Sequence, residues 1–146
     1  MNFDEAWLKK YLEDRYSHNP FVNLLELKIT SMQKGKACMS MPVTKDKHVN
    51  LFGFAHGGAI ATLADTAMGV ACATMQNMVV TLDMNLNFIR SGKPGSELIC
   101  VAEVIHSGKS TMVVDGTVYD TEDKIVAKSR GTFFVQGQFT NDTVSN

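Results

Sequence analysis

The stretch HVNLFGFAHGGAIATLADTAMGVACATM, residues His48–Met75, decides the fold. From Gly57 to Met75, apolar side chains recur on nearly every side of a helix, which is the pattern of a helix buried in a core. A single acidic side chain, Asp65, stands in the middle of this run. The stretch therefore predicts a central helix over Gly57–Met75 that carries a buried carboxylate.

Strand patterns flank this helix on both sides. Short connectors rich in turn-forming residues separate the strands. Such alternation indicates an antiparallel sheet with one buried face, which a long apolar helix can cover. We expect an α+β fold, a curled antiparallel sheet of about five to six strands wrapped around the central helix. The alternating segments are residues 24–32, 36–43, 79–88, 97–105, 110–119 and 124–135.

The two ends of the chain carry patterns of their own. Residues 1–17 mix charged and apolar side chains at helical spacing, which predicts a short amphipathic helix that docks on the rest of the protein. Residues 137–146 are polar and are expected to form a frayed tail. The length of 146 residues is typical of one domain, so 1–146 is expected to be a single domain.

Composition excludes several classes of function. The formal net charge is −1, so we expect neither nucleic acid nor an anionic membrane as a partner. The three cysteines are far apart and lack metal-ligand or redox spacing, so no metal and no cofactor are expected. Buried free thiols fit a reducing compartment, and the charged N-terminus does not resemble a signal peptide, so we expect a cytoplasmic location. No stretch is long and apolar enough to span a membrane.

Asp65 is the first candidate for chemistry. Its helical neighbours at three and four residues are Ala61, Thr62, Met68 and Gly69, and none of them is cationic. An isolated buried carboxylate costs considerable free energy, and aspartate is seldom fully buried without partners. A structural carboxylate is one interpretation, and a functional carboxylate is the one we favour.

The loop before the helix is the second candidate. Gly57 and Gly58 place unpaired backbone N–H groups at the positive end of the helix, where they can polarise a carbonyl oxygen and stabilise an oxyanion. A glycine-rich tight turn is the alternative interpretation. Asn50 is either a turn residue or a hydrogen-bond donor, and His56 is an orienting loop histidine or a bystander.

Distance limits how Gly57 and Asp65 can cooperate. Eight residues separate them, which is ~12 Å of helix rise at about 1.5 Å per residue. One reacting carbon cannot contact both groups of the same helix. Either the two groups serve different purposes, or Asp65 meets the Gly57 of a second copy across a two-fold axis, which creates two identical sites.

These residues form a pattern, N-x5-H-G-G-x6-A-D-x-A, that resembles the PaaI-like, HGG-motif acyl-CoA thioesterases of the hotdog superfamily. The later stretch that begins VTLDMNLNFIRSGKPGSEL is similar to the same family, and the resemblance covers roughly residues 20–135. It implies a sheet wrapped around one helix, a homodimer through paired sheets, and often a dimer of dimers, a homotetramer. The motif residues are Asn50, His56, Gly57, Gly58, Ala64, Asp65 and Ala67.

The resemblance also implies roles. The Gly57 amide, with Asn50, would bind and polarise the thioester carbonyl, while His56 would hold the loop. Asp65 of the partner subunit would activate the attacking water or attack directly. Thr81 would help to orient that water. Strict alternation places Thr81 on the polar face, so it reaches the site only if its strand twists or bulges there.

The substrate implied is an acyl-CoA, so coenzyme A enters as part of the substrate. The candidates for contact with its phosphates are Arg90, Lys93 and Lys109, and the alternative for each is a solvated surface charge. Gly58 is expected at the substrate. An apolar wall would accept aryl or medium to long alkyl chains alike, and its members are Phe52, Phe54, Met68 and Met84.

Two other functions compete with hydrolysis. A hotdog hydratase or dehydratase would use a catalytic histidine with an acid, and His56 with Asp65 could be that pair. An acyl-CoA-binding or sensing module would keep the fold without turnover. The HGG context fits the first poorly, and the intact Asp65 argues against the second.

Overall fold

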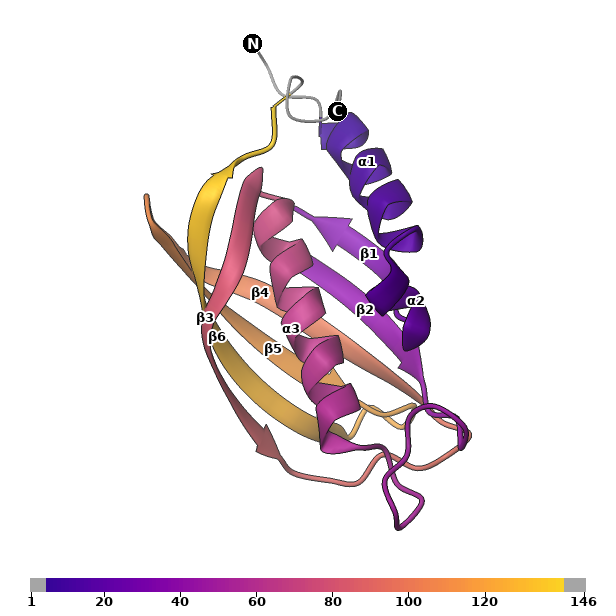
Figure 1. The fold of residues 1–146 in the computed structure, drawn as a ribbon. Helices are drawn as coiled ribbons and strands as arrows, with labels where there is room; N and C mark the ends of the chain where they lie inside the picture. The colour runs from indigo at the N-terminus through magenta and orange to yellow at the C-terminus, as the bar shows by residue number, and fades with distance from the viewer. Residues whose placement is uncertain (1–4, 141–146) are drawn as a thin grey trace.

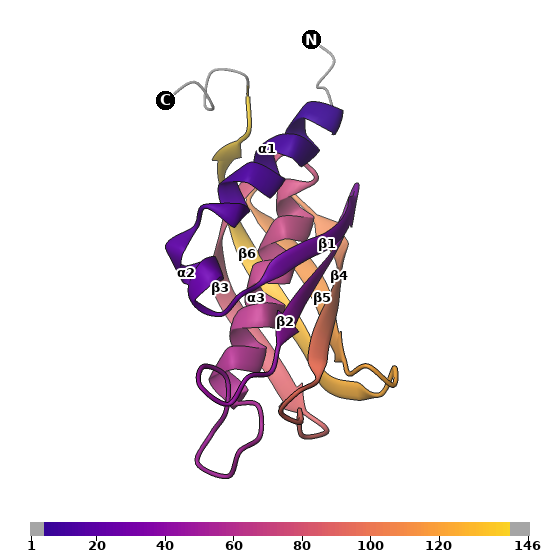
Figure 2. The same cartoon turned by 90° about the vertical axis from the view of Figure 1, so that its right-hand side faces the viewer.

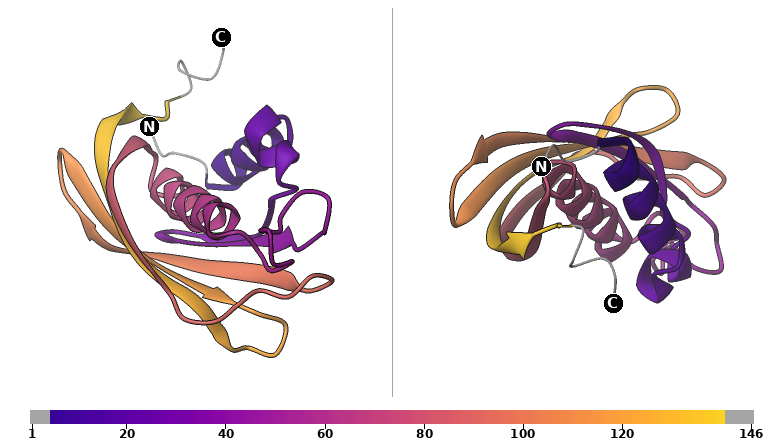
Figure 3. Two further views of the ribbon diagram at one scale, coloured as in Figure 1. Left: turned by 60° about the horizontal axis from the view of Figure 1, so that its bottom comes forward. Right: turned by 90° about the horizontal axis from the view of Figure 1, so that it is seen from above.

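A long helix, α3 (Gly57–Ala73), lies in the concave face of a curled sheet (Figure 1). The computed structural model describes residues 5–140. The first four residues of the predicted N-terminal helix and the last six of the predicted tail lie outside that range. Viewed nearly along the helix, the sheet bends around α3, with the N-terminal helices on the other side (Figure 3). The predicted central helix and α+β architecture are confirmed.

The sheet is antiparallel throughout, and its order is β1-β2-β4-β5-β6-β3. The two edge strands are therefore β1 and β3, which lie on opposite sides of α3 (Figure 2). The strand bounds are β1 (Lys28–Gln33), β2 (Lys36–Pro42), β3 (Asn77–Phe88), β4 (Glu97–Ser107), β5 (Thr111–Tyr119) and β6 (Ile125–Gln138).

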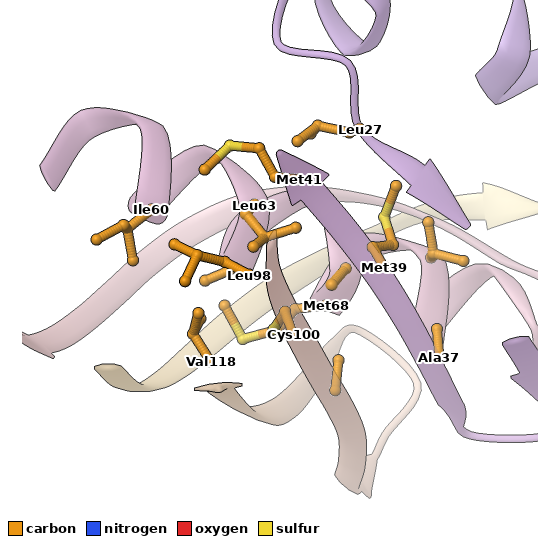
Figure 4. Packing of buried hydrophobic residues seen from close by; sticks show 14 of the residues in the cluster. Leu27, Ala37, Met39, Met41, Ile60, Leu63, Met68, Leu98, Cys100 and Val118 are labelled. Atoms are coloured by element: carbon orange, nitrogen blue, oxygen red, sulfur yellow. The ribbon is translucent and has the colours of Figure 1, made fainter. Parts of the chain in front are cut away.

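The core forms between α3 and the concave face of the sheet. Leu63 and Met68 of α3 meet Met39, Leu98 and Cys100 from the sheet, and all five side chains are fully buried (Figure 4). Apolar surface removed from water contributes roughly 25 cal/mol per Å². A helix that is apolar on nearly every side is stable here because the sheet curls around it.

The predicted N-terminal helix forms as α1 (Glu5–Ser17). Leu8 and Leu12 are buried and form a small cluster with Ala73, at the last turn of α3. Trp7 and Tyr11 stack with ring centroids 5.3 Å apart, one helical turn along the same helix. The expectation that this helix docks on the rest of the protein is met by that cluster.

A second short helix, α2 (Pro20–Leu24), was not predicted from sequence. The Asn19 side chain caps it by accepting hydrogen bonds from Phe21 N and Val22 N, and Pro20 occupies its first turn. This capping motif takes over the beginning of the segment predicted as a strand over 24–32. The strand consequently begins at Lys28.

Two boundaries differ from the predicted ones at the opposite end of the sheet. The start of β3 pairs with the end of β6, with Asn77 opposite Gln138. This pairing orders residues 137 and 138, so the predicted tail over 137–146 begins two residues too early. The helix ends at Ala73 rather than Met75, and the chain leaves it through Gln76, whose left-handed backbone has a φ of 68°. No helix within residues 5–140 is both long and apolar enough to cross a membrane.

Candidate active site

The carboxylate of Asp65 has a partner from another element. Thr81 Oγ1, on β3, donates a hydrogen bond to Asp65 Oδ1 at 2.7 Å. Asp65 is half-buried and Thr81 is exposed in the single chain. The expectation of a fully buried carboxylate is therefore wrong for one chain, because the open edge of β3 leaves this part of α3 accessible.

A β-bulge in β3 brings Thr81 to Asp65. Thr81 pairs with Phe133, but Asp83 pairs with Thr132, so Leu82 is an additional residue on β3. The bulge reverses the alternation, and Val80 and Leu82 are 42% and 58% exposed. Strict alternation over residues 79–88, which placed Thr81 on the polar face, would put Val80 and Leu82 on the buried face, and this prediction is wrong. The bulge that Thr81 needed in order to reach the helix is present.

The first turn of α3 holds the second candidate group. His56 is the N-cap, and its Nδ1 accepts a hydrogen bond from Gly58 N at 2.8 Å. The Gly58 amide is therefore occupied, contrary to the expectation that both glycine amides are unpaired. The Gly57 N–H makes no hydrogen bond to any residue between 5 and 140. It remains an available donor at the positive end of a seventeen-residue helix.

The capping role of His56 also bears on the hydratase interpretation. A catalytic histidine needs a nitrogen that faces the reacting atom and its acidic partner. Here Nδ1 is held by Gly58, and Asp65 lies more than two turns further along the same helix. Within one chain, His56 and Asp65 therefore do not form a catalytic pair.

Asn50 organises the loop that precedes α3. Its Oδ1 accepts hydrogen bonds from Phe52 N at 2.9 Å and Phe54 N at 3.1 Å, and its backbone N–H donates to Phe54 O. Asn50 is thus a turn residue, one of the two predicted interpretations. The other is still available, because its Nδ2 makes no hydrogen bond within the described part of the chain.

Both candidate groups lie along β3. Thr81 touches Asp65 near the middle of α3, while the ring of Phe88, at the other end of β3, packs over Gly57. A Cβ atom added to Gly57 would lie 3.3 Å from Phe88 Cζ. The open amide and the carboxylate therefore flank the same exposed sheet edge, but are separated by the ~12 Å of helix between them.

The basic residues predicted to contact phosphates lie in two separate parts of the structure. Arg90 and Lys93 lie in the loop after β3, which borders the loop before α3 because Ala55 N donates to Gly92 O. The Arg90 guanidinium donates to Ile125 O at 2.9 Å. Lys109 lies in the turn after β4, an eleven-residue strand that starts near Arg90 and spans ~35 Å at about 3.3 Å per residue. The structure does not bring Lys109 to the other two.

Only some of the apolar residues predicted to contact the acyl chain are exposed near the site. Phe52 and Phe54 are exposed beside Asn50, so they are available to an acyl group. Met68 is fully buried between α3 and the sheet, where its sulfur accepts a hydrogen bond from Ser129 Oγ at 3.6 Å. Met84 is half-buried against the core. The structure therefore places Met68 in the core rather than at the wall.

Tyr16 is a neighbour of the site that no sequence pattern singled out. Burial raises the pKa of its hydroxyl to about 12, with smaller contributions from Cys72 and from Asp65. Tyr16 packs against the hydrophobic core that α3 forms with the sheet. The helical spacing from Leu12 to Tyr16 was the sequence signal that could have indicated this packing.

Among residues 5–140, no group of three histidine, cysteine, aspartate or glutamate side chains could hold a metal ion.

Comparison with known proteins identifies similar folds and sequences. The thioesterase superfamily matches residues 52–127. Acyl-coenzyme A thioesterase PaaI of Escherichia coli strain K12 is 34% identical over 127 residues, which cover 87% of this chain and 89% of that protein. The structure of E. coli PaaI, from the phenylacetic acid degradation operon, matches with a TM-score of 0.85 and 32% identity over 92% of this chain and 95% of that one. The α+β hotdog fold expected from sequence is confirmed.

Two streptococcal structures are also similar. A Streptococcus mutans protein bound to acetyl-CoA has a TM-score of 0.75 and 37% identity, covering 78% of this chain and 91% of that one. A hypothetical thioesterase of Streptococcus pneumoniae with coenzyme A has a TM-score of 0.75 and 31% identity over the same shares. Variants of the latter replace one aspartate or one threonine by alanine at positions sixteen residues apart, which is also the separation of Asp65 and Thr81.

Proposed function

The chain belongs to the thioesterase superfamily and is an acyl-CoA thioesterase, and we propose that it hydrolyses aryl- or medium- to long-chain acyl-CoA at sites shared by two subunits. One observation carries the proposal: Asp65, held by Thr81, and the open Gly57 amide flank the same exposed edge of the sheet. The coenzyme A-bound relatives support the substrate class. Coenzyme A is part of the substrate, and the proposed reaction needs no metal or other cofactor.

The exposed β3 edge supports a homodimer. β3 is twelve residues long, and its edge carries the exposed apolar side chains Val80, Leu82 and Phe88. A long apolar edge strand pairs readily with another chain unless it is covered. In the proposed dimer, β3 of one subunit pairs antiparallel with β3 of the other, which joins the two sheets into one.

This pairing brings the separated groups together. A two-fold axis near Met84, about midway between Thr81 and Phe88, makes the two α3 helices antiparallel neighbours. Phe88 packs on Gly57, so the Gly57 end of one subunit then lies level with Asp65 and Thr81 of the other. Gly57 of one subunit and Asp65 of the other then lie close together, although ~12 Å separates the two groups within one helix. Each dimer contains two identical sites of this kind.

Hydrolysis follows from these positions. The Gly57 N–H and Asn50 Nδ2 of one subunit donate hydrogen bonds to the thioester carbonyl oxygen. Asp65 of the other subunit takes a proton from water as the water oxygen bonds to the carbonyl carbon. The tetrahedral oxyanion then collapses, the C–S bond breaks, and the sulfur of coenzyme A receives the proton from Asp65. Thr81 fixes the carboxylate in the orientation that faces the water.

The remaining contacts concern the two ends of the substrate. Arg90 and Lys93 lie beside the loop before α3 and are proposed to contact coenzyme A phosphates, and Lys109 is left out because of its distance. The exposed Phe52 and Phe54 are proposed to contact the acyl group.

Leu51, which is 99% exposed at the tip of the same loop, supports a further pairing of dimers into a homotetramer. The three free cysteines support a reducing, cytoplasmic location.

A hydrolysis screen tests this function. Wild-type protein and Asp65→Asn are incubated with phenylacetyl-, hydroxybenzoyl- and fatty-acyl-CoA, and released thiol is measured over time. We expect turnover of at least one substrate by the wild type and its loss in Asp65→Asn. Binding of acyl-CoA without thiol release by the wild type would instead identify a binding module, and equal turnover by both proteins would exclude Asp65.

A further inference from the structure

We propose that His48 is a positioning residue, whose buried imidazole anchors the loop that carries the two oxyanion donors, Asn50 and Gly57. The inference rests on the proposed function, because it assigns these donors to the thioester carbonyl. His48 itself contacts no reacting atom in this account. It acts through the backbone that connects it to the donors.

The imidazole of His48 is fully engaged. The residue is 1% exposed, although the three residues before it are all exposed. Thr44 N donates to Nδ1 at 3.1 Å, and Thr44 Oγ1 lies 2.9 Å from the same nitrogen. A backbone N–H can only donate, so Nδ1 is an acceptor and Nε2 carries the proton. Nε2 donates that proton to Leu25 O at 2.8 Å.

The hydrogen bond to Leu25 ties the loop to a distant part of the chain. Leu25 follows α2 and lies 23 residues before His48 in sequence. The adjacent Glu26 adopts a left-handed backbone with φ of 57°, which aids the sharp turn between α2 and β1. Glu26 also forms an exposed ion pair with Lys47 at 3.3 Å. The loop is thus attached to this turn by one buried and one exposed contact.

The backbone of His48 is hydrogen-bonded to the segment that carries the oxyanion donors Asn50 and Gly57. His48 O accepts a hydrogen bond from His56 N at 2.7 Å, immediately before Gly57. Val49 forms a β-bridge with Ala55, and Asn50 N donates to Phe54 O at 2.7 Å. These contacts form a short ladder that begins at His48, with Asn50 on one side and the N-cap of α3 on the other (the loop between β2 and α3 in Figure 1).

Few other side chains hold this loop. Between residues 44 and 56, only His48 and Ala55 are buried. The tip side chains Leu51 and Phe52 are 99% and 83% exposed. A loop with so little buried surface depends strongly on each buried contact. A displacement of about 1 Å at a catalytic group can cost ~10²-fold in rate, so the anchor at His48 is expected to affect turnover.

Two substitutions separate the local contact of His48 from the distant one. In His48→Asn, the amide oxygen can replace Nδ1 as acceptor for Thr44 N, but the side chain is too short to reach Leu25 O. In His48→Gln, the longer amide can still donate to Leu25 O. Lys47→Ala is the matched control, because it removes only the exposed ion pair of the same loop with the same turn.

Kinetics provide the first readout. We expect His48→Asn to lower kcat by ~10- to 100-fold, because both oxyanion donors lose their fixed position. KM should change less, because the proposed phosphate contacts of Arg90 and Lys93 lie on another loop and only the proposed acyl contacts of Phe52 and Phe54 lie on this one. His48→Gln should recover most of the loss, and Lys47→Ala should match the wild type. Thr44→Ala, which keeps the imidazole and removes the hydroxyl near Nδ1, should lower kcat in the same direction by less. Wild-type kcat in folded His48→Asn would overturn the proposal.

Amide hydrogen exchange over residues 55–58 provides a readout that does not need turnover. Exchange should be faster in His48→Asn than in the wild type, and restored in His48→Gln. Equal exchange in all three proteins would overturn the anchoring role, whether or not the wild type is active. Absence of thioester hydrolysis by the wild type would overturn the proposed function alone, so the two failures are distinguishable.

Discussion

The Thr81 hydroxyl donates a hydrogen bond to the Asp65 carboxylate across 2.7 Å, from an edge strand to the central helix. This contact depends on the bulge at Leu82, which turns Thr81 from the outer face of β3 toward α3. It holds Asp65 Oδ1, while Oδ2 makes no hydrogen bond to another residue between 5 and 140. In the proposed dimer, the carboxylate held in this way faces the thioester that the second subunit presents.

The first prediction concerns Thr81. Thr81→Val keeps the shape of the side chain and removes the donor, so the carboxylate should lose its fixed orientation. A hydrogen bond to a charged group is worth enough that kcat should fall by ~10-fold or more. Thr81→Ser retains the hydroxyl and should stay close to the wild type. Steady-state kinetics of both variants provide the measurement, and equal kcat for valine and serine would remove Thr81 from the mechanism.

The second prediction concerns the base. Asp65→Asn keeps an oxygen that can accept from Thr81, so the fold and KM should be preserved. Loss of the general base should lower kcat by ~10²–10⁴-fold. If Asp65 were only structural, thermal stability would change while kcat per folded site survived. Circular dichroism melts measured beside the kinetics distinguish these cases.

The third prediction concerns the Gly57 amide. Proline is well accommodated in the first turn of a helix, and the preceding His56 is extended with ψ of 136°, as a residue before proline prefers. Gly57→Pro therefore removes the N–H with little expected damage to α3. Gly57→Ala is the matched control, since it adds the same Cβ near Phe88 but keeps the N–H. We expect turnover of the proline variant to be lower than that of the alanine variant by ~10²–10³-fold. Equal turnover would place the oxyanion donor elsewhere.

The fourth prediction concerns the thiols. Burial raises the pKa of Cys72 and of Cys100 to about 12, so at pH 8 both remain protonated and unreactive. Cys38 is only partly buried. In the native protein, a thiol reagent at pH 8 should modify Cys38 alone, and in denaturant all three cysteines. Rapid modification of Cys72 or Cys100 in the folded protein, mapped by mass spectrometry, would contradict the buried core packing. An enzyme-only blank corrects thiol-release assays for Cys38.

The sequence predicted the central helix, the sheet and the position of Asp65, because each depends on a periodic pattern in one segment. It did not predict the bulge at Leu82, since no glycine or proline marks it, and alternation therefore placed Val80 and Leu82 inside. The sequence also did not predict that Met68 is fully buried, because its burial depends on how strongly the sheet curls around α3. Contacts between distant segments, such as His48 with Leu25, have no local signature in sequence.

Asp65 illustrates a different limit. An apolar helix around a carboxylate predicts burial, yet the carboxylate is half-buried in the single chain. We propose that the second subunit covers Asp65 in the dimer. The burial that the sequence predicts for this carboxylate would then be reached only in the dimer. Whether the two halves of the site meet across that interface is the central claim of this account.

Complementation between two inactive variants tests that claim most directly. Asp65→Asn and Gly57→Pro homodimers are mixed in equal amounts, unfolded and refolded, and native mass spectrometry measures the heterodimers. Each heterodimer combines the intact Gly57 of one chain with the intact Asp65 of the other at one of its two sites. With free reassortment, activity should recover to roughly a quarter of the wild-type value. No recovery in a mixture that contains heterodimers would show that Gly57 and Asp65 do not meet between subunits.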